Sequence, residues 1–266
     1  MSYVPGIDVS VWQDDNSTAQ QMNFAKAKAA GAQFVFIKVS ERGGIDPDFV
    51  YNWKAAKAAG LPRGGYHFLR WDLSALLQAK VFCSMLYGDP GELPPVADFE
   101  APAKDGIYPS NALLLQFLEA VEDRIGRTPI IYTSPGFWST NGKVKGTNRF
   151  DPIWAYYPLW IAHYTKAEQP TMPEPWKSVG KKWLFWQWSC TGDGLKYGAE
   201  SKAIDLNWFN GDPIDFENYL RSVVGDDPLS PDSPAAPADP AGSPAELKAL
   251  QVRIERIEKW AGGFKV

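Results

Sequence analysis

Two acidic residues separated by one aromatic residue are the strongest chemical signal in this sequence. Asp98 and Glu100 flank Phe99 at the end of an apolar segment, residues 95–99. On a β-strand, residues two apart point to the same face, and their Cα atoms lie roughly 6.6 Å apart. Two carboxylates on one apolar wall cannot both ionise cheaply, so the pKa of one should rise. Such a pair can supply the proton donor and the anion that glycoside hydrolysis needs, although a salt-bridged or metal-binding pair has the same spacing.

Further polar residues stand at the ends of other apolar segments. Asp8 follows Ile7 and Asp205 follows Ile204, in positions where an aspartate is often only a turn or cap residue. Lys38 suits either a carboxylate partner or a Schiff-base nucleophile. The other strand-end polar residues are Tyr66, His67, Tyr132, His163 and Gln187. The two histidines are expected to be hydrogen-bonded structural residues rather than catalysts.

The elements that must position these residues are apolar strand-like segments, which alternate with helical ones along residues 1–225. Strands are predicted at 7–9, 34–37, 65–68, 95–99, 129–133, 159–162, 183–188 and 203–205. Helices are predicted at 17–30, 49–59, 73–87 and 111–125, and Gly31, Gly60 and Gly126 are expected to end the first, second and fourth of them. Few helical patterns follow residue 133, so the second half of this region is expected to be irregular.

The pattern within the strands indicates the fold class. The predicted strands are apolar throughout rather than alternating, which is typical of a mostly parallel sheet buried on both faces. Strand–helix alternation over this length predicts an α/β fold, an irregular (β/α) TIM-like barrel. An open doubly wound sheet is the alternative, and it is disfavoured because no Gly-x-Gly-x-x-Gly motif follows the first strand. In such a barrel the chemistry lies at the C-terminal ends of the strands, which is where the polar residues stand.

Composition and charge exclude several classes of protein. The 266 residues are 45% hydrophobic and 22% charged, which is the balance of a folded chain rather than a disordered one. The net charge of −4 offers no broad basic surface, so nucleic acid is not expected as a partner. Only two histidines are present, which excludes a zinc site built on three histidines, and neither a metal nor a cofactor is predicted.

Cys83 and Cys190 are either two buried thiols, which we favour, or one disulfide.

The two ends of the chain differ from its middle. The N-terminus lacks a basic and apolar leader, and no segment is long enough to span a membrane, so we expect cytoplasmic synthesis without a signal peptide and no membrane insertion. Residues 226–245 are rich in Pro, Ala and Asp, which predicts an extended, disordered linker. Residues 246–266 predict a short amphipathic helix, which either forms a homo-oligomer through residues 246–260, docks on a partner, or packs back onto residues 1–225. Its apolar residues are Leu247, Leu250, Ile254 and Ile257.

Eight short motifs occur in the order and at the spacing of a known family. They are Ile7-Asp-Val-Ser-Val-Trp12, Phe36-Ile-Lys-Val-Ser-Glu41 with Gly43, Gly65-Tyr-His-Phe68, Asp98-Phe-Glu100, Ile131-Tyr-Thr133, Leu159-Trp-Ile-Ala162, Trp186-Gln-Trp188 and Ile204-Asp205. Over about residues 3–212 the chain resembles the glycoside hydrolase family 25 muramidases. The resemblance implies an irregular (β/α) barrel that cleaves the β-1,4 bond between N-acetylmuramic acid and N-acetylglucosamine in the glycan strands of peptidoglycan.

The resemblance also implies roles for individual residues. Glu100 would be the general acid that protonates the leaving oxygen. Asp98 would stay ionised, and would either stabilise the oxocarbenium-like centre or orient the acetamido group of the substrate. Asp8 and Asp205 would hold and tune this pair through hydrogen bonds. The residues expected to line the sugar subsites are Lys38, Tyr66, Tyr132, Trp160 and Gln187.

The chain departs from the family pattern in one loop, where Glu41-Arg42-Gly43-Gly44 replaces the usual Glu-Gly. With no signal peptide, it resembles a phage endolysin that is released to the cell wall by a separate holin, and a prophage gene or a virion-associated lysin also fits.

The alternatives to a muramidase are a catalytically silent peptidoglycan-binding module, an aldolase that uses Lys38, a zinc amidase or cysteine peptidase, and a chitinase. A chitinase is disfavoured because Val96 stands where its third acidic residue would be.

Overall fold

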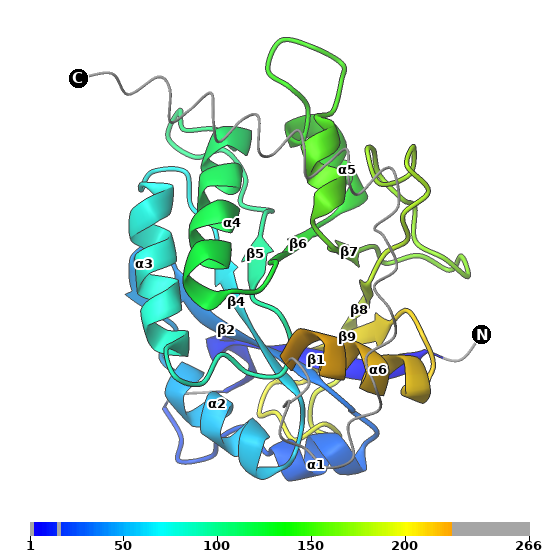
Figure 1. Cartoon of the computed structure of the whole chain (residues 1–266). Coiled ribbons are helices and arrows are strands. Elements are labelled where there is room, and N and C mark those ends of the chain that lie inside the picture. Colours follow the sequence, from blue (N-terminus) through cyan, green and yellow to red (C-terminus); the bar gives the residue numbers. More distant parts are fainter. Residues whose placement is uncertain (1–2, 15–16, 225–266) are drawn as a thin grey trace, which may run out of the picture.

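The computed structural model describes residues 3–14 and 17–224 (Figure 1). The predicted linker at 226–245 and the predicted helix at 246–266, with its oligomerisation segment, lie outside the described residues and stay predictions. No helix in the described part of the chain is both long enough and apolar enough to cross a membrane.

A closed barrel of eight strands forms the centre of the molecule (Figure 1). Neighbouring strands run parallel except at β9, which closes the ring by pairing antiparallel with both β8 and β1. The barrel strands are β1 (Val4–Val9), β2 (Val35–Glu41), β4 (Arg63–Phe68), β5 (Val96–Asp98), β6 (Ile130–Thr133), β7 (Leu159–Ala162), β8 (Phe185–Asp193) and β9 (Ala203–Phe209). The short β3 (Gly44–Ile45) forms a hairpin with β2. The predicted (β/α)-barrel class is confirmed, and the antiparallel last strand is a feature that the pattern did not predict.

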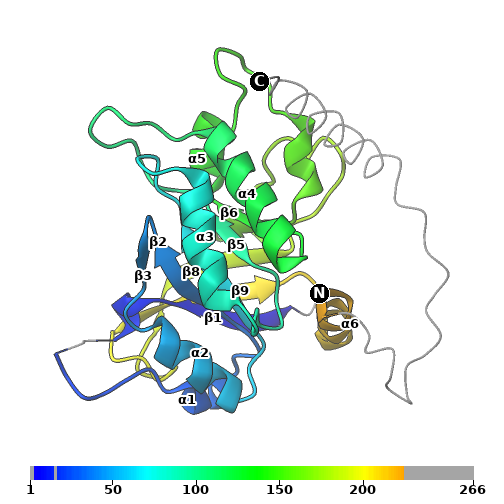
Figure 2. The same ribbon diagram turned by 60° about the vertical axis from the view of Figure 1, so that its left-hand side comes forward.

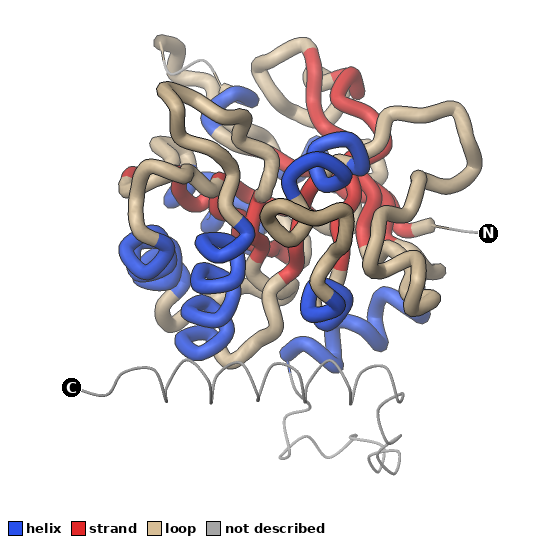
Figure 3. The backbone as a smooth tube through the Cα atoms, turned by 90° about the horizontal axis from the view of Figure 1, so that it is seen from above, coloured by secondary structure: helices blue, strands red, loops and turns tan. Residues whose placement is uncertain are grey.

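Helices flank part of the barrel, and loops flank the rest (Figure 3). The helices are α1 (Phe24–Ala29), α2 (Phe49–Ala58), α3 (Ala75–Leu86), α4 (Asn111–Ile125), α5 (Pro135–Asn141) and α6 (Pro213–Val224), with 3-10 turns η1 (Val11–Gln13) and η2 (Pro152–Tyr156). Figures 1 and 2 show α3 and α4 side by side on the outside of the barrel. The end of the barrel where the parallel strands begin is covered by α6, because its Phe216 packs on Phe34.

The helices differ from the prediction in two places. The first helix begins only after Asn23, because the Asn23 side chain accepts a hydrogen bond from the backbone N–H of Lys26 and so caps the helix. Residues 17–22 are therefore not helical. The second half of the barrel region is irregular, as expected, but it contains α5 and α6, which were not predicted.

Aromatic side chains fill the inside of the barrel. The rings of Phe36 and Trp160 stack with centroids 4.4 Å apart, and Phe36 meets Phe185 edge to face at 5.0 Å. We call these three buried residues the aromatic floor. Residues two apart on a strand share a face, so the inward face that carries Phe36 also carries Lys38, and the face with Phe185 also carries Gln187. The floor therefore lies directly beneath the polar strand ends.

Candidate active site

The polar side chains predicted from the strand ends converge above the aromatic floor. They line one pocket of about 220 Å³, at the end of the barrel opposite α6. Its wall contains every site residue predicted from the sequence, namely Asp8, Lys38, Tyr66, Asp98, Glu100, Tyr132, Trp160, Gln187 and Asp205. Four further residues line the pocket and were not predicted, namely Ser10, Trp12, Gln13 and Phe68.

The alternation predicted around Phe99 is present. Asp98 and Glu100 face the pocket, while Phe99 is fully buried in the core outside the barrel. Two hydrogen bonds to the neighbouring strand β6 hold this segment in place. The Phe99 backbone N–H donates to the carbonyl of Tyr132, and the Thr133 hydroxyl donates to the carbonyl of Phe99, each at 2.9 Å. The two carboxyl groups are therefore held on one wall, as strand geometry requires.

Burial raises the pKa of both carboxyl groups of this pair. Asp98 is only 5% exposed, and its Oδ1 atom has no hydrogen-bond partner among the described residues. Burial is the larger cause and the charge of Glu100 the second cause that raise the pKa of Asp98 well above its usual range. Burial and then the charge of Asp8 raise the pKa of Glu100. The pair therefore retains a proton at a pH where two exposed carboxylates would have lost theirs.

A second pair of carboxyl groups, Asp8 and Asp205, completes the acidic set. The two residues lie directly opposite each other on the antiparallel strands β1 and β9. Burial raises the pKa of Asp8 to about 6, whereas burial and the charge of Asp8 raise the pKa of Asp205 to about 8. Asp205 therefore keeps its proton at neutral pH and donates a hydrogen bond to Asp8. The expected position of Asp205 at the C-terminal end of a strand is wrong: it lies near the start of β9, and reaches this end of the barrel because β9 is antiparallel.

Two amide side chains hold Asp8 in place. Gln187 Nε2 and Asn207 Nδ2 donate to Asp8 Oδ2 at 2.9 and 2.7 Å. The oxygen of the Gln187 amide accepts hydrogen bonds from the hydroxyls of Tyr132 and Tyr164, at 2.9 and 2.7 Å. Because the amide oxygen is occupied by two donors, the amide nitrogen is directed at Asp8.

Asn207 and Tyr164 belong to this network, but neither was among the predicted site residues. Trp160 Nε1 donates to Asn207 Oδ1 at 2.8 Å, which directs the Asn207 amide nitrogen at Asp8. Asn207 lies two residues after Asp205 and shares its face, so extending the last predicted strand past residue 205 would have found it. Tyr164 lies in the loop after β7, where strand alternation gives no signal.

Lys38 lies in a chain of ion pairs at the edge of the pocket. Its Nζ atom is 2.6 Å from Glu41 Oε2, and Arg70 Nε donates to the other carboxylate oxygen of Glu41 at 2.7 Å. Burial acts to raise the pKa of Glu41, but the hydrogen bonds and charges of Lys38 and Arg70 lower it overall. An ammonium group held by a carboxylate is not the neutral amine that Schiff-base formation needs, which disfavours the aldolase alternative.

The histidines are structural, as predicted, and neither lines the pocket. The ring nitrogens of His67 lie 2.8 Å from Ser40 Oγ and 3.0 Å from Gln78 Oε1. Burial lowers the pKa of His67 to about 4, so it is neutral at physiological pH. His163 Nδ1 accepts a hydrogen bond from a backbone N–H.

The cysteines are two free thiols rather than a disulfide. Cys83 is buried, as favoured, but Cys190 is exposed. Within residues 3–14 and 17–224, no three His, Cys, Asp or Glu side chains are grouped so that they could hold a metal ion.

Several known proteins are similar to this chain in sequence and in fold. Residues 7–194 match the profile described as Glycosyl hydrolases family 25. Lysozyme M1 of Streptomyces globisporus is 34% identical over 221 residues, which cover 79% of this chain and 69% of that protein. An N,O-diacetylmuramidase of Chalaropsis sp. is 30% identical over 218 residues, covering 76% of this chain and 94% of that protein. The crystal structure of the bacterial lysozyme from Streptomyces coelicolor is similar with a TM-score of 0.64 and 30% identity, covering 84% of this chain and 98% of that one.

These matches, together with the barrel and its inward-facing carboxyl pair, define the protein as a glycosidase. It belongs to glycosyl hydrolases family 25. The resemblance noted in the motifs is therefore confirmed for the family and for the fold.

Asp98→Asn should stabilise the fold more at pH 8 than at pH 5. When folding raises the pKa of a carboxyl group, stability falls as the pH rises from the unfolded value toward the folded one, because the unfolded state releases a proton that the folded state keeps. An amide at position 98 removes that loss. The measurement is the free energy of unfolding in urea at both pH values, with Asp123→Asn on the exposed side of α4 as the control. A change that is the same for both variants at both pH values would contradict a raised pKa at Asp98.

Proposed function

We propose that this glycosidase is a muramidase, which hydrolyses the β-1,4 bond between N-acetylmuramic acid and N-acetylglucosamine in peptidoglycan. The observation that carries the proposal is the pair formed by Asp98 and Glu100, whose pKa values are both raised in one pocket. A carboxylic acid beside a carboxylate is the arrangement that cleaves a glycosidic bond. The names of two related enzymes, a lysozyme and an N,O-diacetylmuramidase, support peptidoglycan as the substrate.

Glu100 is proposed as the general acid that protonates the leaving oxygen. It is the less buried of the two carboxyl groups, so a glycosidic oxygen can approach it. In the free protein burial raises the pKa of both carboxyl groups, so the pair shares a proton. Bound substrate is proposed to place this proton on Glu100. A sugar that covers Glu100 removes water from it, while positive charge at the anomeric carbon, or an acetamido N–H, stabilises the anion of Asp98.

Asp8 and Asp205 are proposed to position and tune this pair. Neutral Asp205 and two amides donate to Asp8, which favours its anionic form. The charge of Asp8 in turn raises the pKa of Glu100, and so favours the protonated form that a general acid needs. These two residues therefore act through Glu100 rather than on the sugar.

Five other residues of the pocket, those expected to line the sugar subsites, are proposed to contact the sugars. They are Lys38, Tyr66, Tyr132, Trp160 and Gln187. Burial and, second, nearby carboxylates raise the pKa of both tyrosines, so their hydroxyls stay neutral. The Tyr66 hydroxyl can donate a hydrogen bond to a sugar, whereas the Tyr132 hydroxyl donates to Gln187 and can accept one. Trp160 is 2% exposed and belongs to the aromatic floor, so its proposed role is to shape the pocket from below.

We also propose that the protein acts as a phage endolysin, made in the host cytoplasm and released to the wall by a separate holin. The family resemblance and the proposed peptidoglycan substrate support this role, in which the enzyme degrades the wall of the host cell from inside. Expression in a bacterial cytoplasm should lyse the cells only when a holin is expressed with it. Lysis without a holin would contradict this route of release.

Glu100→Gln should lower the rate of wall hydrolysis by about 100- to 10,000-fold, the usual contribution of a general acid, while the unfolding midpoint is retained. The measurement is incubation of each protein with peptidoglycan, followed by reduction and mass spectrometry of the new ends. We expect reduced muramic acid ends with the wild type and almost none with the variant.

Other products in this assay would contradict the proposal in distinct ways. Reduced glucosamine ends would identify a glucosaminidase, and new amino groups would identify an amidase or peptidase. Binding of the wild type to several wall types without any new ends would identify a silent binding module. Full activity of Glu100→Gln would show that another group is the acid.

Asp205→Asn should retain more activity than Asp205→Ala, because an amide can still donate a hydrogen bond to Asp8. Wild-type activity should fall as the pH rises above about 8, where Asp205 ionises and a second negative charge faces Asp8. The asparagine variant should lack this fall. The measurement is kcat/KM from pH 5 to 10, and an alkaline limb that is the same in wild type and Asp205→Asn would contradict the assignment.

A further inference from the structure

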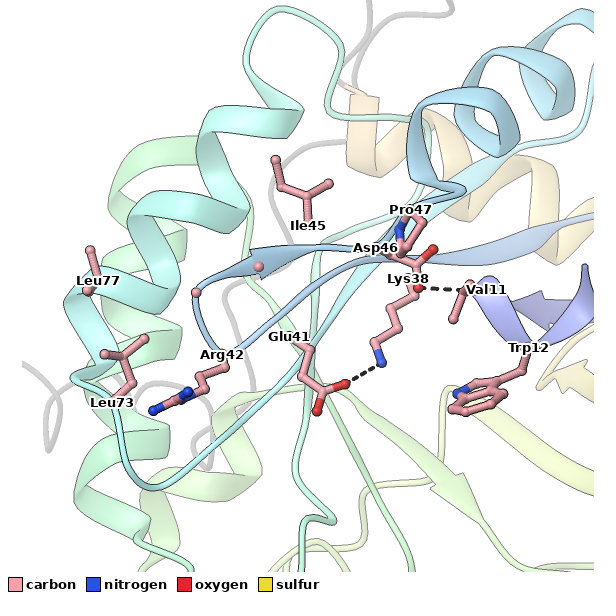
Figure 4. A pocket seen from close by; sticks show the side chains of 12 residues that line it. Val11, Trp12, Lys38, Glu41, Arg42, Ile45, Asp46, Pro47, Leu73 and Leu77 are labelled. Carbon is pink, nitrogen blue, oxygen red and sulfur yellow. Dashed lines mark hydrogen bonds and ion pairs between the residues drawn. The ribbon is translucent and has the colours of Figure 1, made fainter. Parts of the chain in front are cut away.

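A second hollow, of about 670 Å³, adjoins the catalytic pocket (Figure 4). We call it the side pocket. Trp12 and Lys38 line both hollows, so the two share a wall. In Figure 4, Trp12 lies on one side of the side pocket and Leu73 and Leu77 on the other, with the ion pair of Lys38 and Glu41 between them. The side pocket has the volume of a small-molecule site, and nothing in the catalytic mechanism uses it.

Trp12 is 77% exposed, yet hydrogen bonds hold the backbone of the turn that carries it. Ser10 Oγ accepts hydrogen bonds from the backbone N–H groups of Trp12 and Gln13, and the Gln13 side chain accepts one from the Ser10 N–H, which completes a capping box. The neighbouring Val11 N–H donates to Oδ2 of the buried Asp46, at 3.2 Å. The indole therefore projects from a fixed backbone into water. Such preorganisation lowers the entropic cost of binding a ligand against its flat face.

The rest of the side pocket combines apolar surface with paired charges. Its apolar residues are Val11, Ile45, Pro47, Leu73 and Leu77. Two cations, Lys38 and Arg42, are balanced by two anions, Glu41 and Asp46. Arg42 is also paired with Asp72, outside the pocket, at 2.9 Å. This balance favours a neutral ligand over the charged stem peptides of peptidoglycan.

A pyranose ring has the complementary chemistry. One of its faces presents C–H groups that can stack on an indole, and its edge presents hydroxyl and acetamido groups that can bond to paired ions. The catalytic pocket, at about 220 Å³, holds only a short part of a glycan strand. The strand must continue outside it, and the side pocket lies next to it, because Trp12 and Lys38 line both hollows.

We propose that the side pocket is a further sugar subsite, in which Trp12 stacks on an N-acetylhexosamine of the strand beyond those in the catalytic pocket. This inference rests on the proposed function as a glycan hydrolase. It assigns a role to the loop with Glu41 and Arg42, where the chain departs from its family pattern, because this loop forms the wall of the side pocket.

The test measures binding in the Glu100→Gln background, so that the ligand is not cleaved. Calorimetry gives the affinity for peptide-free glycan fragments of two and of six sugars. The same measurement is made after adding Trp12→Ala, Trp12→Phe or Tyr87→Ala. Tyr87 is the matched control, because it is 93% exposed but borders a different hollow, between α3 and α4.

Trp12→Ala should weaken binding of the six-sugar fragment by about tenfold, the effect of one aromatic contact, and that of the two-sugar fragment much less. Trp12→Phe should restore most of the affinity, and Tyr87→Ala should change nothing. Unchanged affinity of Trp12→Ala for six sugars would overturn the inference. An effect seen only with peptide-bearing strands would overturn it in favour of a stem-peptide site. If the Glu100→Gln protein bound no glycan at all, the proposed function would fail, and the inference with it.

Discussion

The site depends on one constraint, which is that the carboxyl groups at one end of a closed barrel are shielded from water. The aromatic floor closes the barrel beneath them, and the strands supply alternate residues to the floor and to the pocket above it. For Asp8, Asp98, Glu100 and Asp205 alike, burial is the largest influence on the pKa, and it acts upward each time. The proton needed for glycoside cleavage is retained because the barrel is filled with aromatic rings rather than water.

Burial of so many acidic groups opposes folding, and the surrounding side chains offset only part of this cost. Asp8 accepts hydrogen bonds from the amides of Gln187 and Asn207. Tyrosine and tryptophan side chains donate to the oxygens of these two amides and so orient them. Asp98 Oδ1 has no such partner in the part of the chain that the structure describes. A site arranged for stability alone would not leave that atom without a partner. Asp98 instead lines the pocket where the substrate is proposed to bind.

Local periodicity predicted much of this arrangement. The two-residue spacing of Asp98 and Glu100 placed them on one wall, and apolar strand ends identified the other predicted site residues apart from Trp160, which only the family resemblance implied. Pairing direction is not a local property, so the antiparallel β9 was missed, and with it Asn207, whose role depends on the strand continuing past Asp205. Tyr164 and Trp12 were missed for another reason. They lie outside the strands, in the turn η1 and in the loop after β7, where tertiary contacts rather than strand periodicity decide the direction of a side chain.

Desolvation keeps a proton on the acidic set, Asp8, Asp98, Glu100 and Asp205, in the free protein. Carbon-13 NMR of side-chain carboxyl groups, titrated from pH 3 to 9 with single Asp→Asn and Glu→Gln variants for assignment, tests it most directly. We expect the carboxyl groups of Asp98, Glu100, Asp8 and Asp205 to titrate above the range of exposed aspartates and glutamates, with Asp205 near pH 8. Titration of all four near pH 4 would contradict it, and would show that water reaches the pocket in spite of the aromatic floor.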